Sequence, residues 1–234
     1  MSIFDSLISV QFPPNQYFRM EHPKKQIVLH HTVSGGTARG DIDWWLQTAH
    51  RIATCVIIDR TGVIYQCFFS KHWAHHLGVK AKIFRANGFR DPIGRNLRLN
   101  QQSIGVELDS WGGLVKGHNG HWFNAVWNRT NKRYEPGTFK VTNVQKYDQG
   151  FRGFLGFEKY TKAQIKTLKE LLLFWKDIYT KIPFDYRESI WDVDKDALKQ
   201  VPGIYTHVSY RPDKSDCHPQ PELIEMLKGL SDSN

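Results

Sequence analysis

The 234-residue sequence predicts a single α/β domain, and three observations lead to that prediction. Apolar, β-rich runs typical of buried strands occur at 26–32 and 103–109. Two helical stretches, 161–180 and 219–230, follow them toward the C-terminus. Strands followed by helices are typical of one sheet with helices packed around it. The chain is also long enough to bury a core without disulfide or metal staples.

The first half of the chain supplies the expected strands. Residues 1–22 predict an irregular N-terminal arm, followed by the strand QIVLHHT at 26–32. A short helix is expected over 40–50. Within 53–69, two β-rich runs flank the residues DRTG, and this pattern predicts a hairpin. The run SIGVELD at 103–109 predicts a further buried strand.

The second half contains the clearest helix. Thr161 and Gln164 fit a capping box at the start of 161–180, where apolar residues recur at three- and four-residue steps. A short strand is expected over 203–209, and the last helix over 219–230, opened by a proline and closed near a glycine.

The stretch 111–157 has a different character. It is rich in glycine, asparagine and aromatic residues and shows no helical period. We therefore expect a loop-rich insertion with short strands, since a connection of this length is usually functional or disordered. The sequence as a whole predicts one catalytic domain over 1–234, with an arm at 1–22 and the insertion at 111–157.

The net charge of +9 and the pI near 9.4 favour polyanionic partners such as nucleic acid, anionic membranes or cell walls. Lysines and arginines are scattered, with no block of five or six like charges, which argues against a nucleic-acid-binding tail. The three cysteines, Cys55, Cys67 and Cys217, are a poor disulfide framework and indicate synthesis in a reducing compartment. The N-terminus lacks the features of a secretory leader, and no apolar run reaches the length of a membrane span.

Three places carry side chains that could do chemistry. The pair His30-His31 ends an apolar strand. Glu107 is an acid inside the run IGVEL, and His207 precedes the segment KSDC. Each has an ordinary explanation alone, because a strand histidine is commonly a hydrogen-bonded core residue and a strand acid is often salt-bridged. Successive strand residues face opposite sides, so at most one of His30 and His31 points easily into a given site, and alternation does not choose between them.

Taken together, these side chains fit a more specific pattern. Two histidines with an aspartate or a cysteine are the ligand set of a catalytic zinc ion, which leaves a fourth position to water. Zinc lowers the pKa of that water from about 15.7 to near 7. Amide hydrolysis also needs a carboxylate for proton transfer and a positive charge near the oxyanion, and Glu107 and Lys214 are of these types.

Five short motifs follow one another along the chain. They are IVLHHT, the hairpin VIIDRTGVIYQ, WAHHLG at 73–78, SIGVEL at 103–108, and THVSYRPDKSDC. In this order they resemble the type 2 N-acetylmuramoyl-L-alanine amidases, which include phage lysozymes, bacterial anhydro-muropeptide amidases and animal peptidoglycan recognition proteins. The resemblance covers about 26–110 and 160–230 and leaves 111–157 unmatched.

The resemblance implies a zinc site. It places two ligands at His30 and His207. The family uses aspartate or cysteine as the third ligand, and the two-residue step from Lys214 favours Asp216, with Cys217 left open as the alternative. A thiolate would also suit zinc.

The resemblance also implies catalytic and substrate-binding residues. It places the catalytic glutamate at Glu107 and the oxyanion lysine at Lys214. His76, Trp73 and His31 are expected to bind substrate. Some family members carry a tyrosine at the start of the hairpin, where this sequence has Ala-Thr-Cys, so a tyrosine-assisted mechanism is not expected.

By resemblance, the fold is a mixed central sheet flanked by helices, and the activity is zinc-dependent hydrolysis of the bond between N-acetylmuramic acid and L-alanine in peptidoglycan. The expected partner is peptidoglycan, acted on by a monomer, with no nucleic acid or membrane. The basic charge and missing leader favour a phage endolysin, made in the host cytoplasm and released to the wall.

Several alternatives remain open. A non-catalytic peptidoglycan-binding protein could share the fold, although such relatives typically lack a zinc ligand. A cytoplasmic enzyme that recycles muropeptides would act on soluble anhydro-muropeptides instead of intact wall. A nucleic-acid-binding protein would need a clustered basic face with stacking aromatics. A zinc peptidase with another bond specificity would carry the same ligands.

Overall fold

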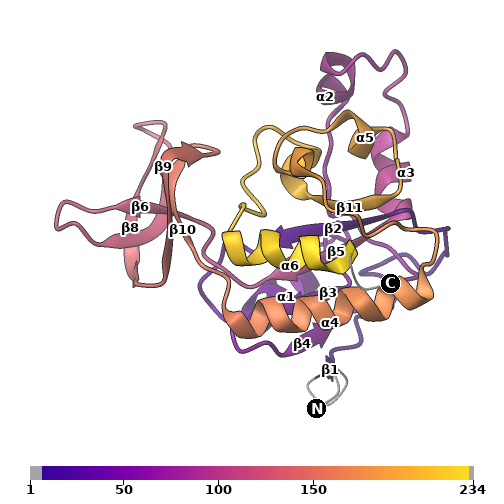
Figure 1. The fold of residues 1–234 in the computed structure, drawn as a ribbon, viewed down its shortest axis with the longest axis horizontal. Coiled ribbons are helices and arrows are strands. Elements are labelled where there is room, and N and C mark those ends of the chain that lie inside the picture. The colour runs from indigo at the N-terminus through magenta and orange to yellow at the C-terminus, as the bar shows by residue number, and fades with distance from the viewer. Residues whose placement is uncertain (1–6, 232–234) are drawn as a thin grey trace.

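The computed structural model describes residues 7–231, which form a central sheet with helices on both faces and a second sheet at one side (Figure 1). The central sheet has six strands in the order β1-β4-β3-β5-β2-β11. These strands are β1 (Leu7–Ser9), β2 (Gln26–His31), β3 (Val56–Ile58), β4 (Ile64–Gln66), β5 (Ser103–Leu108) and β11 (Gly203–Thr206). β3 and β4 pair antiparallel and the other neighbours pair parallel, so the mixed central sheet is confirmed.

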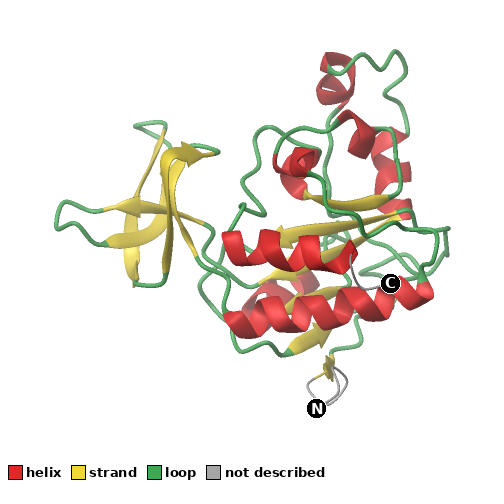
Figure 2. Ribbon diagram, viewed as in Figure 1, coloured by secondary structure: helices red, strands yellow, loops and turns green. Residues whose placement is uncertain are grey.

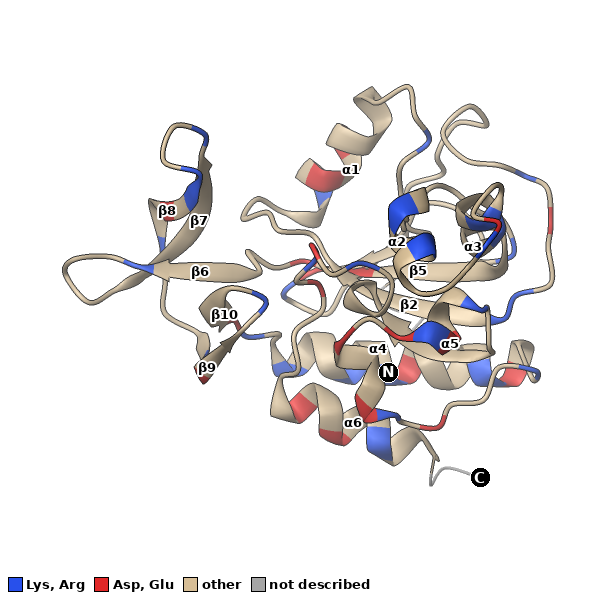
Figure 3. Cartoon of the chain, turned by 90° about the horizontal axis from the view of Figure 1, so that it is seen from above, with Lys and Arg blue, Asp and Glu red and all other residues tan. Residues whose placement is uncertain are grey.

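Helices cover both faces of the central sheet. The longest, α4, packs beside α6 on one side, and α1 lies on the other (Figure 3). The α-helices are α1 (Ala38–Gln47), α2 (Ala81–Ala86), α3 (Arg95–Gln102), α4 (Lys162–Ile178), α5 (Lys195–Leu198) and α6 (Pro221–Ser231). Short 3₁₀ turns occupy Glu188–Trp191 and His207–Ser209. No described helix has both the length and the apolar character needed to span a membrane.

The start of α4 is fixed by the capping box that the sequence predicts. The Thr161 side chain accepts from the backbone N–H of Gln164, and the Gln164 side chain accepts from the backbone N–H of Thr161. The Gln164 amide also donates to the backbone at the ends of β3 and β5, which ties the helix to the sheet. One face of α4, including Leu168, Leu172 and Trp175, is buried in the core. Each such side chain contributes roughly 1.5–3 kcal/mol of burial free energy.

The β3–β4 hairpin is confirmed, and its turn chemistry is visible. The Asp59 carboxylate accepts from the backbone N–H groups of Thr61 and Val63. Gly62 has φ of 88°, a conformation that favours glycine. The DRTG sequence therefore closes the hairpin for local reasons.

The insertion contains the strands that were expected, but they form one antiparallel sheet, which corrects the expectation that loops predominate. We call residues 113–158 the wing, because they project from the side of the central domain and contain no helix (Figures 1 and 2). Its five strands have the order β8-β7-β6-β10-β9. They are β6 (Gly113–Lys116), β7 (Trp122–Asn128), β8 (Arg133–Val141), β9 (Val144–Phe151) and β10 (Phe154–Glu158).

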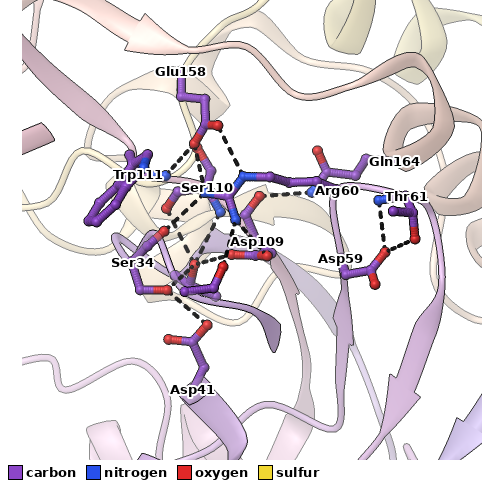
Figure 4. A network of polar contacts seen from close by, with 12 residues as sticks. Ser34, Asp41, Asp59, Arg60, Thr61, Asp109, Ser110, Trp111, Glu158 and Gln164 are labelled. Atoms are coloured by element: carbon purple, nitrogen blue, oxygen red, sulfur yellow. Dashed lines mark hydrogen bonds and ion pairs between the residues drawn. The ribbon is translucent and has the colours of Figure 1, made fainter. Parts of the chain in front are cut away.

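An ion-pair network anchors the wing to the central sheet (Figure 4). Arg60 lies in the hairpin turn, and its Nη1 atom is 2.6 Å from Oδ2 of Asp109 at the end of β5. Its Nε and Nη2 atoms donate to Oε1 and Oε2 of Glu158 on β10, at 3.0 and 2.9 Å. Glu158 accepts in addition from the backbone N–H of Trp111, where the chain enters the wing. Both carboxylates are largely buried, so one guanidinium holds the two sheets together.

Two segments differ from expectation. The N-terminal arm contributes strand β1, which pairs parallel with β4, although residues 1–6 lie outside the described residues. Helices α2 and α3 fill the connection before β5, where the sequence predicted no element. The first is only six residues long, too short for helical periodicity to stand out.

Candidate metal centre and cleft

Three side chains from distant parts of the sequence meet at one end of the central sheet. His30 is the penultimate residue of β2, His207 follows β11, and Asp216 lies in the loop before α6. The Nδ1 atoms of His30 and His207 are 3.0 Å apart. Asp216 Oδ2 lies 3.2 Å from His30 Nδ1 and 2.8 Å from His207 Nδ1. These three side chains could hold a metal ion, and all three are buried.

We call the Nδ1 atoms of His30 and His207 and the Oδ2 atom of Asp216 the donor triangle. Its chemistry and its size both fit zinc. Zinc binds imidazole nitrogen and carboxylate oxygen at about 2.0–2.2 Å, so neighbouring donors on a tetrahedral ion lie about 3.3 Å apart. The three observed separations, 2.8 to 3.2 Å, are close to that edge length. Two imidazoles and one carboxylate are also a ligand set of catalytic rather than structural sites, with a fourth position open.

Hydrogen bonds behind the ligands fix which imidazole nitrogen faces the donor triangle. His207 Nε2 donates to the carbonyl oxygen of Leu77 at 2.9 Å, which leaves Nδ1 as a lone-pair donor. His30 Nε2 lies 2.9 Å from His76 Nδ1, and His76 Nε2 lies 2.8 Å from Ser103 Oγ. Because the Ser103 hydroxyl donates to the Leu99 carbonyl, it accepts from His76, and His76 in turn accepts from His30. Such outer contacts hold a ligand histidine in its metal-binding tautomer.

We call the hydrogen-bonded series from His30 through His76 to Ser103 the relay. Alternate residues of strand β5 hold the His76 ring in it. Ser103, Gly105 and Glu107 share one face of the strand, because side chains alternate along it. A Cβ atom on Gly105 would lie 3.0 Å from His76 Nδ1 and 2.7 Å from a methyl group of Thr54. The glycine therefore leaves the space that the His76 ring occupies, between the serine that holds it and the glutamate beyond.

Glu107 faces the donor triangle from β5. It is paired in register with His30 on the neighbouring parallel strand, so the two side chains lie on the same face of the sheet. Its Oε2 atom is buried and has no hydrogen-bond partner among the described residues. Burial raises the pKa of the Glu107 carboxyl well above its ordinary value, and the charge of Asp216 adds to the rise while Lys214 opposes it. An unpartnered carboxyl of this kind can exchange a proton with a bound water.

The protonation states of the cluster suit metal binding. Burial, reinforced by His207, lowers the pKa of His30 to about 4, which keeps its imidazole neutral. Burial alone would raise the pKa of Asp216, but His207 and His30 hold it well below its ordinary value. Metal ligands must be deprotonated, so a neutral imidazole and an ionised carboxylate are the required forms.

A cleft of about 520 Å³ opens over the donor triangle. The central sheet contributes His30 and Glu107 to its floor, and the loop before α6 contributes Lys214. Tyr134 and Phe154 reach the cleft from the wing. The cleft is therefore shared between the central domain and the wing.

Of the three residues expected to bind substrate, two line the cleft and one does not. His31 borders the cleft, but its Nδ1 is paired with the Tyr160 hydroxyl at 2.8 Å. His76 borders the cleft as well, behind His30. Trp73 is not brought into the cleft: it is buried and stacks on Phe18 with ring centres 3.9 Å apart. That contact belongs to the N-terminal arm.

Cys217, the alternative third ligand, lies outside the donor group. It is fully buried next to the Tyr160 hydroxyl and does not line the cleft. All three cysteines are free.

Trp44, which is 56% exposed on α1, lines the cleft and was missed by motif reasoning, although its position on the expected helix 40–50 was a signal.

Comparison with known proteins places these features in context. The family model described as N-acetylmuramoyl-L-alanine amidase matches residues 20–221. No curated protein matches the chain. Among solved structures, a point mutant of PlyL shares the fold, with 12% identity and a TM-score of 0.50 over 97% of this chain and 99% of that one.

Two further solved structures are similar at lower scores. A selenomethionine derivative of AmpD has 16% identity and a TM-score of 0.49, over 97% of this chain and 94% of that one. The endolysine N-acetylmuramoyl-L-alanine amidase LysCS from Clostridium intestinale URNW has 11% identity and a TM-score of 0.48, over 97% and 96%.

Proposed function

Since the chain belongs to the N-acetylmuramoyl-L-alanine amidase family, we propose that it cleaves the muramoyl–L-alanine amide of peptidoglycan with a zinc ion held by His30, His207 and Asp216. The observation that carries the proposal is the buried donor triangle with a buried, unpartnered carboxylate oxygen of Glu107 on the same face of the sheet. A domain that only bound the wall would have no need for such an oxygen beside a complete ligand set.

Each side chain at the centre has a role that its position supports. Zinc, when bound there, polarises the scissile carbonyl and lowers the pKa of a water. Glu107 accepts the proton of the attacking water and returns it to the alanine nitrogen, which leaves as an amine. Lys214, which lines the same cleft, stabilises the negative charge that develops on the carbonyl oxygen. His76 holds His30 in place and does not touch the reacting atoms.

Asp216 is the better candidate than Cys217 for the third ligand. Its Oδ2 completes the donor triangle with both histidines, whereas Cys217 packs against Tyr160. An Asp216→Ala variant should therefore lose zinc, and a Cys217→Ala variant should keep it. Zinc content by atomic spectroscopy after dialysis measures both.

We propose that the physiological substrate is the polymeric wall, which makes the protein a lytic enzyme of the endolysin kind. A net charge of +9 favours attraction to an anionic polymer. A recycling enzyme would instead prefer soluble anhydro-muropeptides. Relative rates on purified sacculi and on such fragments separate the two roles.

The direct test is mass spectrometry of sacculi digested with and without a chelator. Stem peptides that begin at L-alanine should appear only without chelator and return when zinc is added. A Glu107→Gln variant should bind zinc but release no peptide, and Glu170→Gln on the outer side of α4 is the matched control. Release of peptide by the Glu107 variant would overturn the catalytic assignment. Intact wall in every sample would overturn the amidase activity.

A further inference from the structure

A second hollow, which we call the wing groove, lies on the wing next to the catalytic cleft. It measures about 650 Å³ and is formed entirely by residues of the wing. Tyr134 and Phe154 line both the wing groove and the cleft, so the two hollows are adjacent at these side chains.

Aromatic rings run from the cleft into the wing groove. Trp127 contacts Tyr134 with ring centres 5.0 Å apart, and Tyr134 contacts Phe154 at 4.9 Å. Trp127 is 50% exposed and Tyr134 is 48% exposed, so about half of each large ring is open to a bound molecule. Exposed aromatic surface bordered by polar groups marks ligand-binding grooves, and flat rings suit the apolar faces of sugars.

The wing groove is also basic. Lys116, Arg133 and Lys146 line it, against one carboxylate, Asp148. Arg133 is engaged by Glu135, whereas no ion pair involving Lys116 or Lys146 occurs among the described residues. Two unpaired ammonium groups beside aromatic rings favour a polymer that combines sugar rings with carboxylates.

The wing groove is held rigidly against the catalytic loop. His218, two residues beyond Asp216, donates from Nε2 to the carbonyl oxygen of Glu158 on β10. Its Nδ1 accepts from the hydroxyl of Tyr147 on β9 at 2.8 Å, and its ring stacks on Phe157 with centres 4.6 Å apart. Tyr147 itself lines the wing groove. The segment that carries the third metal donor is therefore bonded to the floor of the groove.

We propose that the wing groove binds the peptidoglycan strand beyond the muramoyl unit whose amide is cleaved. Sugar rings of the glycan stack along Trp127 and Tyr134, and carboxylates of neighbouring stem peptides pair with Lys116 and Lys146. This inference rests on the proposed amidase function and adds that the wing makes the enzyme selective for polymer over short fragments. Peptidoglycan is favoured over nucleic acid because the groove is adjacent to the cleft in which, by the proposed function of this amidase-family chain, peptidoglycan is cleaved.

The test compares variants of the wing groove on two substrates. Trp127→Ala and the double variant Lys116→Glu with Lys146→Glu should each lower kcat/KM on sacculi by about tenfold or more, as expected for an anchoring contact. On a single muramoyl tripeptide, which cannot reach the groove, both should match the unaltered protein. Val126→Ala, on the same strand as Trp127, and Lys140→Glu, on β8, are controls in the wing whose side chains do not line the groove.

Binding without turnover is measured separately. Co-sedimentation with sacculi in the presence of a chelator should be weakened by the groove variants and not by the controls. Equal losses on both substrates, or unchanged sedimentation, would overturn the groove proposal while leaving the amidase intact. If the unaltered protein cleaves neither substrate, the proposed function fails, and sedimentation alone still decides the groove. Stronger retention of single-stranded DNA than of wall fragments at the groove would also overturn it.

Discussion

Removing the hydroxyl of Ser103 should weaken zinc binding, although Ser103 touches no metal donor. Ser103 Oγ accepts from His76 Nε2 at 2.8 Å, and His76 Nδ1 accepts from His30 Nε2 at 2.9 Å. With zinc on His30 Nδ1, the His30 proton must sit on Nε2, so His76 must present its Nδ1 lone pair. In Ser103→Ala, His76 can do so only by leaving its Nε2–H buried and unpaired.

The size of the loss in zinc affinity depends on how that cost differs between the zinc-bound and the zinc-free protein. A buried unpaired donor costs about 1–3 kcal/mol. Without zinc the pair can take the other tautomer: His76 donates to His30, whose Nδ1–H then donates to Asp216, 3.2 Å away, and a buried lone pair of His76 instead of its N–H is left unpaired. The zinc-bound state does not have this choice of tautomer, so its cost is the greater of the two, and an affinity loss of about tenfold corresponds to about 1.4 kcal/mol. Loss of an outer partner of a ligand histidine typically weakens metal binding about 10–100-fold.

The assay is zinc affinity by competition with a chromogenic chelator at neutral pH. Ser110→Ala is the matched control, because Ser110 is equally buried and its hydroxyl contacts a backbone N–H outside the relay. Thermal unfolding of the zinc-free proteins should show that both variants are folded. A zinc Kd for Ser103→Ala within twofold of the unaltered protein, with the fold intact, would refute the relay.

Three further changes test other parts of the structure. Gly105→Ala should push the His76 ring away, because the new Cβ would lie 3.0 Å from its Nδ1, and zinc titration should show weakened binding; unchanged affinity would contradict the packing argument. Arg60→Met leaves two buried carboxylates without their cation, so urea unfolding should show a loss of about 3 kcal/mol, and a loss below about 1 kcal/mol would contradict its anchoring role. Burial lowers the pKa of Lys24 from 10.5 to about 8, so between these values the unfolded chain binds more protons and stability rises with pH. Relative to Lys24→Met, the zinc-free protein should gain up to about 3 kcal/mol of unfolding free energy across that window, and a flat difference would contradict the depressed pKa.

Local signals predicted much of the central domain. The DRTG turn, the capping box at Thr161 and the apolar run of β5 are each specified by a few neighbouring residues, and the structure has all three. The wing could not be predicted in the same way. Its strands carry glycine and polar residues and are mostly exposed, so neither burial nor alternation marked them, and their pairing depends on contacts between strands.

The choice between neighbouring residues also needed three dimensions. Alternation along the strand could not separate His30 from His31, because each has apolar companions on its own face. In the structure, His30 shares a face with Glu107 and His31 is held by Tyr160 on the other side. The preference for Asp216 over Cys217 came from the spacing of a motif in a resembling family. The structure supports it for a different reason, because Asp216 Oδ2 lies near the Nδ1 atoms of both histidines and Cys217 packs against Tyr160.

The relay behind His30 explains why one strand motif serves two purposes. In SIGVEL, Glu107 was the residue to which motif reasoning assigned chemistry, yet Ser103 and Gly105 lie on the same face and hold the ring of His76. The motif that contains His76 suggested a residue lining the substrate groove; His76 does line the cleft, but its two ring nitrogens are both occupied by protein partners. A side chain with no free polar atom can position a ligand but has nothing left to offer a substrate. Under the proposed function, alternation along β5 would link proton transfer at Glu107 to the orientation of the metal donor His30 through Ser103 and Gly105.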